Sequence, residues 1–325
     1  MKALVTGSSG FIGSHIVDEL LKRGYEVVGL DNMSTGISRY LNDARNNKLY
    51  RDEFLDLLNF NQLKSVMDGV DIVYHMAANA DIRGGTENTF LDLEQNIIAT
   101  YNVLEAMRLS KTAKRICFAS SAAALGEPSI FPTPENIPIP NQTSLYGASK
   151  MAGEGLISAY CNAFDIEGYC FRFVSLLGPR YPHGHVFDFV KKLREDARQL
   201  NILGDGTAKK SYLHIDDCIS ALMLICEDIR PSRQKSGKFD IYHLGMEEFI
   251  EVKESAKLIA TELNLMPKYI FGEGKRGWIG DNPFVFLDVS KIKKLGWKPK
   301  NTIEASIKQT AKWLNENNWI FVERR

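Results

Sequence analysis

Two residues that could move a proton, Tyr146 and Lys150, lie four positions apart in the stretch Ser144-Leu-Tyr-Gly-Ala-Ser-Lys150. On a helix this spacing places both side chains on one face. A lysine ammonium beside a phenol favours the phenolate, so it lowers the tyrosine pKa from about 10 toward the range of a general base. Ser121, which follows Ser120 at the end of an expected strand, could hydrogen-bond the hydroxyl being deprotonated. Tyr-x-x-x-Lys spacing also occurs on solvated helix faces, so its meaning depends on the elements that precede it.

The composition is that of a globular chain of 325 residues, long enough for one large domain or two closely packed ones. Lysine plus arginine equals aspartate plus glutamate at 40 each, so no net charge attracts nucleic acid or an acidic membrane surface. We find no apolar run of about 18 residues and no signal peptide. We therefore expect a soluble, cytoplasmic protein that binds neither nucleic acid nor membrane.

The cysteines are odd in number and have no C-x-x-C spacing, which indicates reduced, mostly buried thiols rather than disulfides or metal ligands. They are Cys117, Cys161, Cys170, Cys218 and Cys226. Two histidines, His183 and His185, lie two apart without a third ligand in view, so we interpret them as part of a substrate-side loop and expect no metal.

A glycine loop opens the chain. Residues 2–6 form a short apolar strand, Gly7-Ser-Ser-Gly10-Phe-Ile-Gly13 follows it, and a helix is expected to run to about residue 23. The next strand, residues 26–30, ends at Asp31, which lies 24 residues after Gly7. This order of strand, glycine loop, helix, strand and acidic residue is typical of a dinucleotide site, where pyrophosphate lies on the helix amino terminus. Asp31 would bind the adenosine ribose and repel a 2′-phosphate, and Asn32 rather than arginine follows it, which favours NAD over NADP.

Further apolar strands alternate with helices, as a parallel sheet requires. Asp56 could contact the adenine amino group or serve as a turn or cap aspartate, and the sequence leaves both open. Residues 71–75 form a strand that ends at His75, which we interpret as a packed histidine rather than a proton shuttle. A helix over 90–109 carries Asn96, and residues 115–120 form the next strand.

By this point the chain resembles the extended short-chain dehydrogenase/reductase family, which contains nucleotide-sugar epimerases and dehydratases. The resemblance covers essentially the whole chain. It rests on Gly7–Gly13, Asp31, His75-Met-Ala-Ala78, Ser120-Ser121, Tyr146-x-x-x-Lys150, Arg172-x-x-x-x-x-Gly178-Pro179, Gly204-Asp-Gly206 and Tyr212-Leu-His-Ile-Asp-Asp217.

The resemblance implies an α/β fold, with a doubly wound parallel sheet of the Rossmann type and a smaller mixed α/β carboxy-terminal substrate domain. We expect the NAD-binding domain over 1–173, with 236–262 returning to it, and an interleaved nucleotide-sugar domain over 174–325. The expected cofactor contacts are Gly7, Ser9, Gly10, Phe11, Ile12, Gly13, Asp31, Asn32, Asp56, Leu57, Ala77, Ala78, Asn96, Ser120, Tyr146 and Lys150.

The family's chemistry starts with hydride transfer from a sugar carbon, usually C4, to bound NAD. The resemblance implies that Tyr146 removes the hydroxyl proton, that Lys150 tunes it and holds the nicotinamide ribose, and that Ser121 hydrogen-bonds the sugar oxygen. Dehydratases resemble one another in placing an aspartate and a glutamate directly after the serine or threonine. Here those positions are Ala122 and Ala123, which cannot transfer a proton, so the chain resembles the 4-epimerases.

Substrate contacts are predicted at Ser121, Ala122, Tyr146, Ser175, Lys210 and Arg276. Lys210 and Arg276 would bind the diphosphate or ribose, although an exposed surface residue is the alternative for each. Lys210 stands where many relatives have arginine, and a lysine supplies a point charge rather than a planar fork. Ser175 replaces the family's sugar-contacting asparagine, and Leu125 replaces a tyrosine.

Three functions fit the sequence. The leading one is an NAD-dependent epimerase acting at C4 of a UDP-linked hexose. The second is a dehydratase, dehydrogenase or reductase of the same family, and the third is a non-enzymatic dinucleotide sensor. The resemblance also implies a homodimer that packs the helices at about 90–109 and 146–164, with apolar positions Ile97, Tyr101, Leu104, Leu156 and Tyr160 compatible with it.

Overall fold

The computed structural model describes residues 1–82, 84–138, 140–231, 238–274 and 284–323, which form two compact units. The first unit contains Met1–Glu127, Ile137–Arg172 and Ile219–Tyr242. The second unit contains Pro128–Asn136, Phe173–Cys218 and His243–Arg325.

The boundaries of the units differ from the expected domain boundaries at three places. The stretch that begins at Ile219 was expected in the nucleotide-sugar domain, but it belongs to the first unit. Residues 243–262 were expected with the NAD-binding domain, but helix α8 (Val252–Glu262) packs in the second unit against α6 (His185–Glu195) and α10 (Ile303–Glu316). Pro128–Asn136 also lies in the second unit, because the backbone of Thr133 bonds to Phe286 and Asp288. Long-range pairing of this kind leaves no local sequence signal.

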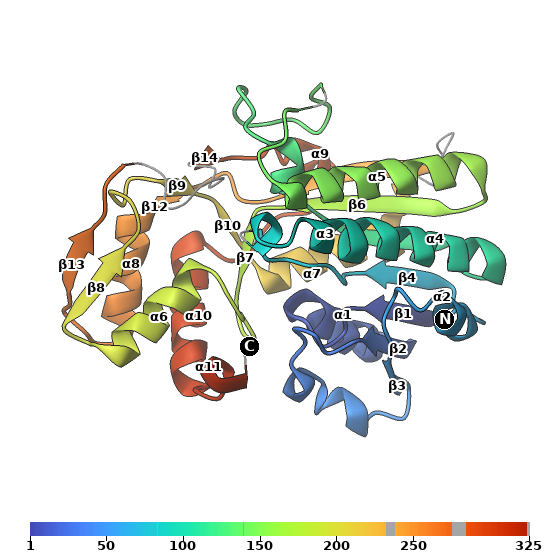
Figure 1. Ribbon diagram of the computed structural model, residues 1–325, viewed down its shortest axis with the longest axis horizontal. Coiled ribbons are helices and arrows are strands. Elements are labelled where there is room, and N and C mark those ends of the chain that lie inside the picture. The colour runs from blue at the N-terminus through green and yellow to red at the C-terminus, as the bar shows by residue number, and fades with distance from the viewer. Residues whose placement is uncertain (83, 139, 232–237, 275–283, 324–325) are drawn as a thin grey trace. The chain divides into compact units, whose positions relative to one another are not determined.

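The first unit is built on a seven-stranded sheet with the strand order β11-β6-β5-β4-β1-β2-β3 (Figure 1). The strands are β1 (Lys2–Thr6), β2 (Glu26–Asp31), β3 (Tyr50–Phe54), β4 (Ile72–His75), β5 (Arg115–Ser121), β6 (Glu167–Phe173) and β11 (Phe239–Leu244). The central pairs are parallel, and Thr6 is in register with both Leu30 and His75. The strand order reverses between β1 and β4, and ligands of open α/β sheets bind at the carboxyl ends of strands at such a point.

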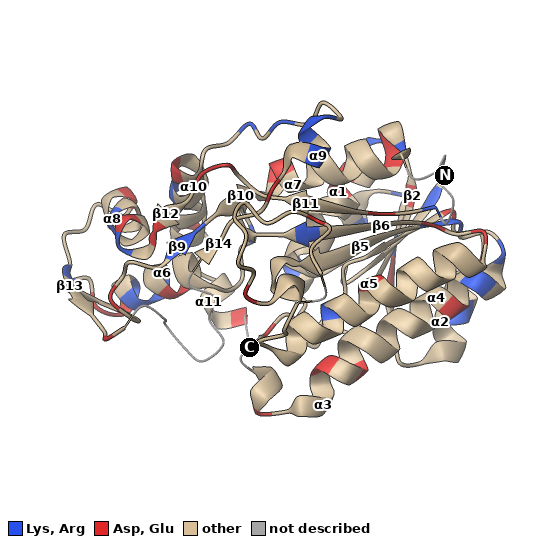
Figure 2. Cartoon of the chain, turned by 90° about the horizontal axis from the view of Figure 1, so that it is seen from above, with Lys and Arg blue, Asp and Glu red and all other residues tan. Residues whose placement is uncertain are grey.

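Helices cover both faces of this sheet, as expected of a doubly wound fold. Figure 2 shows α4 (Ala99–Ser110) and α5 (Leu145–Ala163) side by side on one face, with α2 (Phe60–Val66) beyond α4, and α1 (Phe11–Lys22) and α7 (Ile215–Met223) on the other. The core of the first face joins apolar residues of α2, α4 and α5 to those of the strands, among them Leu63, Val103, Met107, Ile157, Val73 and Ile116. Burying this surface is the main favourable term that fixes the helices on the sheet.

The long helix expected over 90–109 is interrupted. It consists of α3 (Thr89–Asp92), a π-helical turn (Leu93–Ile98) and α4. The π-helical turn contains Asn96, and such turns inside helices are frequent at functional sites.

Strand β3 was not expected from the sequence. Its residues alternate poorly and only partly bury their side chains, because β3 lies at the edge of the sheet. Charged residues such as Arg51 and Glu53 are common on edge strands, where they discourage pairing with another chain. The strand pairs with β2 and so places Phe54 opposite Asp31.

The second unit is a mixture of short sheets and packed helices. Strands β7 (Ser175–Leu177) and β10 (Tyr212–His214) pair in parallel, β9 (Lys209–Lys210) lies between β12 (Ile250–Glu251) and β14 (Phe284–Val285), and β8 (Gln199–Ile202) pairs with β13 (Lys268–Phe271). Helices α6, α8 and α10 pack against one another, and α9 (Ser290–Lys293) and α11 (Ile320–Glu323) are short.

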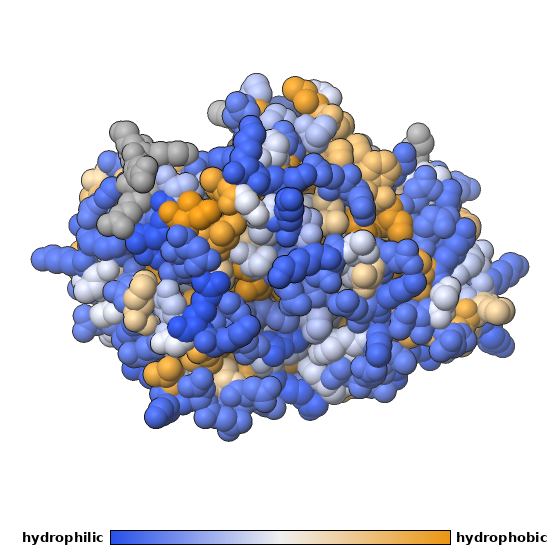
Figure 3. Space-filling model, turned by 180° about the vertical axis from the view of Figure 1, so that it is seen from behind, coloured by the Kyte–Doolittle hydropathy of each residue, from blue (hydrophilic) through white to orange (hydrophobic). Residues whose placement is uncertain are grey.

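Charges of both signs are spread over the helices and loops (Figure 2), and the face seen in Figure 3 is mainly hydrophilic with small apolar patches. No helix among the described residues is long and apolar enough to cross a membrane. All five cysteines are described, and they are buried thiols outside disulfides, as predicted.

Candidate active site

The glycine loop after β1 passes directly against the loop after β4. Gly7 has a φ of +67°, and a Cβ there would lie 2.8 Å from the backbone nitrogen of Ala77. A Cβ on Gly13 would lie 2.0 Å from the carbonyl oxygen of Gly7. Only glycine fits at these positions, and the backbone stays bare where the amino terminus of α1 begins. This is the cradle that a dinucleotide pyrophosphate needs.

Asp31 closes the other side of this loop. Its carboxylate accepts hydrogen bonds from the backbone N–H groups of Ser9 (2.9 Å) and Met33 (2.8 Å). Burial raises the pKa of Asp31, and the two N–H groups lower it in part. Each oxygen keeps a lone pair, so the carboxylate can still accept from ribose hydroxyls.

Asp56 is held as a turn aspartate. One oxygen accepts from the backbone N–H of Leu58 (2.9 Å) and the other from the side-chain amide of Asn32 (2.9 Å). The sequence left a turn role and an adenine contact open, and the structure supplies the turn role. The adenine contact stays a prediction, as do those of Phe11, Ile12, Leu57 and Ala78.

Tyr146 and Ser121 meet as predicted. Helix α5 begins after Ser144, whose side chain accepts from the N–H of Gly147 (3.0 Å), and Tyr146 is buried in its first turn. Ser121 ends β5, accepts from the N–H of Ala123 (3.1 Å) and hydrogen-bonds Tyr146. Because the Ser121 oxygen already accepts from Ala123, its own proton is available for donation.

Lys150 lies one turn further along the same face. Its ammonium donates to the carbonyl of Ala119 (2.8 Å) and lies 5.0 Å from the ring centre of Phe118 and 5.7 Å from that of Tyr146. Burial lowers the pKa of Lys150 to about 8.

The predicted lowering of the Tyr146 pKa is wrong for the chain alone. Burial raises the pKa of Tyr146 to about 12, the hydrogen bond from Ser121 lowers it, and the negative charge of Asp92 raises it further. The sequence showed the lysine but not the burial, and desolvation of the phenolate outweighs an ammonium that faces a carbonyl.

Asn96, a predicted cofactor contact, is engaged within the protein. Its side-chain oxygen accepts from the N–H of Asn79 (2.8 Å), and its amide nitrogen donates to Asp92 (3.0 Å) and Ser149 (2.9 Å). Asp92 was not predicted from the sequence, although it precedes Asn96 by four residues and so lies one helical turn away.

Ser120, another predicted cofactor contact, directs its hydroxyl to Glu154 at 2.5 Å. Arg172 donates to both oxygens of Glu154, at 2.9 and 2.7 Å. Glu154 was also missed, although it stands four residues after Lys150 on the face that carries Tyr146. The repeated spacing of four was the available signal.

His75 is a packed histidine, as predicted. Its ring nitrogens lie 2.8 Å from the Thr6 hydroxyl and 3.0 Å from that of Thr100, which donates its proton to the carbonyl of Asn96 (2.6 Å). This arrangement fits a neutral ring that donates to Thr100 and accepts from Thr6. Burial lowers the pKa of His75 to about 3, and the charge of Lys150 adds to that shift.

In the second unit, the predicted substrate residues Ser175 and Lys210 lie on strands of two different sheets. Ser175 opens β7 in register with Tyr212 of β10, and Lys210 ends β9 just before it. The charge of Lys210 contributes to lowering the pKa of His185 to about 3, with burial as the larger cause. His185 lies between the hydroxyls of Ser255 (2.6 Å) and Tyr212 (3.0 Å). Arg276 lies outside the described residues.

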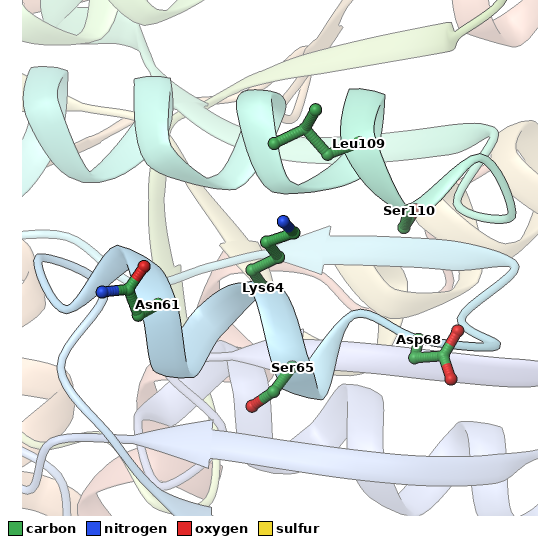
Figure 4. Close-up of a pocket in the computed structure, with 6 residues that line it drawn as sticks. All are labelled: Asn61, Lys64, Ser65, Asp68, Leu109 and Ser110. Carbon is green, nitrogen blue, oxygen red and sulfur yellow. The ribbon is translucent and has the colours of Figure 1, made fainter.

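No group of three or more histidine, cysteine, aspartate or glutamate side chains that could hold a metal ion occurs in the described part of the chain. A surface hollow of about 370 Å³ lies between α2 and the end of α4 and is lined by Asn61, Lys64, Ser65, Asp68, Leu109 and Ser110 (Figure 4). Asp68 precedes β4 and Ser110 precedes β5, so this hollow lies at the amino edge of the sheet. Gly7, Asp31 and Ser121 follow or end their strands and so lie at the opposite edge of this sheet.

Residues 3–245 match the profile of the NAD dependent epimerase/dehydratase family. This chain belongs to that family. Family membership fixes the cofactor as NAD, and the glycine cradle and Asp31 fit it. It also makes the chain a nucleotide-sugar enzyme of the extended short-chain dehydrogenase/reductase type.

Relatives of this family resemble the chain over nearly its full length. The "Putative UDP-glucose 4-epimerase" of Methanocaldococcus jannaschii is 32% identical over 322 residues, which cover 97% of this chain and 99% of the relative. A solved UDP-galactose 4-epimerase has a TM-score of 0.87 at 32% identity and covers 98% of this chain and 100% of its own. The Thermus thermophilus UDP-glucose 4-epimerase in complex with NAD has a TM-score of 0.83 at 28% identity and covers 97% and 99%.

Proposed function

We propose that this protein inverts C4 of a UDP-linked hexose through a transient 4-keto intermediate. The observation that carries the proposal is the pair Ala122 and Ala123 directly after Ser121, beside the buried Tyr146 and Lys150. A dehydratase needs an additional acid and base to remove water, and alanine can be neither. An intermediate with no such group beside it can rotate and be reduced again on its other face, which is epimerisation.

The chain's own residues would act on the proton. Tyr146 accepts the hydroxyl proton in the first half-reaction and returns it in the second. When the sugar binds, Ser121 would donate its proton to the sugar oxygen in place of Tyr146 and keep that oxygen in line with Tyr146. Lys150, whose pKa burial lowers to about 8, stays mostly charged at neutral pH and lies on the same face of α5 as the phenol. NAD, when bound, would supply the hydride acceptor for the sugar carbon and would be regenerated, so no cofactor would be consumed.

A proton NMR time course tests the reaction. The purified protein, without added cofactor, is mixed in turn with UDP-, GDP-, CDP- and dTDP-sugars, and we expect a second anomeric signal that grows to a fixed ratio with a UDP-hexose. A 4-keto or deoxy product would instead show dehydration. A reaction that proceeds only with added NAD(P)H would show a reductase.

Tyr146→Phe should lower kcat by about 10²–10⁴-fold, because the general base is lost. Tyr160→Phe is the matched control: Tyr160 lies on the same helix, and its hydroxyl donates to Glu105 (3.1 Å). A biological activity unchanged by Tyr146→Phe would support a dinucleotide sensor and remove the catalytic role.

We further propose that Lys210 and Ser175 contact the nucleotide sugar, together with Arg276. Lys210→Ala should raise KM with little change in kcat, because the lysine would bind the diphosphate equally in ground and transition state. Lys209→Ala controls for the charge, since the Lys209 ammonium lies over the ring of Phe249, 5.0 Å from its centre. If KM rises equally in Lys210→Ala and Lys209→Ala, the effect is that of losing any positive charge from this segment, and Lys210 does not contact the diphosphate.

We also propose a homodimer through α4 and α5. Exposed apolar side chains support it, among them Tyr101 of α4 (45% exposed) and Leu145 of α5 (43%). Of the five apolar positions selected from the sequence, Leu104 is instead part of the core. Sedimentation should show a dimer at micromolar concentration and a monomer for Tyr101→Glu, and a monomeric wild type would remove the proposal.

A further inference from the structure

Asp92 is a buried carboxylate that the proposed reaction does not use. It ends α3 and is 2% exposed. One oxygen accepts from the side-chain amides of Asn79 (2.9 Å) and Asn96 (3.0 Å). Among the described residues the other oxygen, also buried, has no hydrogen-bond partner, and no lysine or arginine of that part of the chain forms an ion pair with Asp92. Buried carboxylates are normally paired, so this one needs an explanation.

The amides that Asp92 holds lead to the catalytic helix. Asn96 donates to the Ser149 hydroxyl (2.9 Å), and that hydroxyl donates to the carbonyl of Tyr146 (2.8 Å). Asn79 lies in the loop after β4, and its backbone N–H donates to Asn96 (2.8 Å). One carboxylate oxygen therefore joins the loop after β4, the π-helical turn and the first turns of α5.

The unpartnered oxygen is covered by backbone. A Cβ on Gly85 would lie 2.5 Å from it, so a side chain at this position would have to displace the carboxylate. Lys150, on α5, is a buried ammonium whose only hydrogen bond in the described chain is to the carbonyl of Ala119. Among the described residues neither the Asp92 carboxylate nor the Lys150 ammonium forms an ion pair, and the two charges act on one another.

We propose that Asp92 is a positioning residue for Tyr146 and Lys150, which fixes α5 through Asn96 and Ser149 and supplies the negative charge that the buried Lys150 ammonium lacks. The proposal rests on the proposed function of Tyr146 as the base. It adds a residue that touches neither substrate nor cofactor and acts only through its hydrogen bonds and its field.

The electrostatics agree with this geometry. The groups that act on Asp92 are Lys150 from α5 and Asp81 from the loop after β4, while Asn79 and Asn96 are neutral donors. In turn, the Asp92 charge raises the pKa of both Tyr146 and Lys150. It therefore keeps Lys150 charged and makes the phenol harder to ionise. Removing the charge while keeping the hydrogen bonds should make Tyr146 ionise at lower pH.

Two substitutions separate these roles. Asp92→Asn keeps the oxygen that accepts from Asn79 and Asn96 and removes only the charge. Asp92→Ala removes both. Glu87→Gln, an exposed carboxylate five residues earlier, controls for loss of one negative charge from the same segment.

The first readout needs no sugar. In the NAD-loaded protein, the Tyr146 phenol is titrated by carbon NMR of labelled tyrosine, and its signal is assigned by its loss in Tyr146→Phe. We expect the midpoint to move to lower pH in Asp92→Asn and to stay in place in Glu87→Gln. The second readout is the pH dependence of kcat, whose acid limb should move in the same direction. Asp92→Ala should also lower kcat by about 10- to 100-fold through misplacement of α5.

An unmoved phenol midpoint in folded Asp92→Asn would overturn the proposal. So would an Asp92→Ala variant that folds and keeps the wild-type kcat. If the wild type inverts no sugar while the midpoint still moves, the proposed function fails and the role of Asp92 stands. The two failures can therefore be told apart.

Discussion

Two buried carboxylates act on the Lys150 ammonium: Glu154, which lies on the same helix as Tyr146 and Lys150, and Asp92, which ends α3; the protein surrounds them with different partners. Glu154 receives two hydrogen bonds from Arg172 and one from Ser120, so its charge is neutralised. Asp92 receives only neutral amides from the described residues and keeps one oxygen without a partner there. Both act on the Lys150 ammonium, yet in the described part of the chain only Glu154 is in an ion pair.

The difference shows how a fold can use one kind of side chain for two purposes. The Arg172 guanidinium offsets much of the field of Glu154, so the main role of Glu154 is to hold α5 to β5 and β6. An unpaired carboxylate costs stability but acts on every nearby titratable group. Glu154 is therefore expected to matter for folding, and Asp92 for the protonation of Tyr146.

The largest effect on stability should come from breaking the buried ion pair between Glu154 and Arg172. Glu154→Ala leaves the Arg172 guanidinium buried without its carboxylate and should lower the free energy of unfolding by about 3–5 kcal/mol. Glu53→Ala, which removes one side of the exposed Arg51–Glu53 pair, should cost at most about 1 kcal/mol. Chemical denaturation measures the free energy of unfolding of both variants. Equal losses would show that the buried Glu154–Arg172 pair stabilises the fold no more than the exposed Arg51–Glu53 pair does.

Ser120→Ala should have the next largest effect. It removes one donor from the buried Glu154 carboxylate and should cost about 1–3 kcal/mol. The neighbouring Ser121→Ala should instead lower kcat by about 10²-fold with little change in stability, because it removes a donor to the reacting oxygen. If Ser120→Ala weakens NAD binding and leaves stability unchanged, the cofactor role predicted from sequence is the correct one.

Ser149→Ala tests the hydrogen bonds that lead from Asp92 to Tyr146. It removes the hydroxyl between Asn96 and the carbonyl of Tyr146, and we expect a loss of about 0.5–1.5 kcal/mol in the free energy of unfolding. The measurement is denaturation together with kcat. Ser158→Ala, further along α5, is the control, and its kcat should stay at the wild-type value. If Ser149→Ala also keeps the wild-type kcat, the hydroxyl of Ser149 does not position Tyr146.

Asp92→Asn should have the smallest effect on stability, and that effect should depend on pH. Burial raises the pKa of Asp92 above its ordinary value of 3.8, so the folded state binds this proton more tightly than the unfolded state. Such a group loses stability as pH rises from about 4 through the raised pKa. Thermal unfolding should therefore show that the stability of Asp92→Asn increases relative to that of the wild type as pH rises through this window. A constant difference across that range would mean that burial does not penalise the charge.

Much of the fold followed from sequence patterns. The glycine loop, the strand that ends at Asp31 and the helices around Asn96 and Tyr146 appear close to their expected positions. Strand β3 and helix α8 were not predicted. In the case of β3, the reason is that an edge strand of polar residues shows no apolar alternation. The boundary over residues 243–262 differed, because α8 is placed by its packing against α6 and α10.

The sequence by itself determined the spacing of Tyr146, Lys150 and Glu154, because helical periodicity is local and puts residues four apart on one face. It also determined the bare backbone of the glycine loop. Tertiary structure alone decided how those groups ionise, since burial depends on segments distant in the chain. Ser149 is joined to Asn96, 53 positions before it, and Glu154 to Arg172, 18 positions after it. The direction of the Tyr146 pKa shift follows from that enclosure, which no spacing of residues reveals.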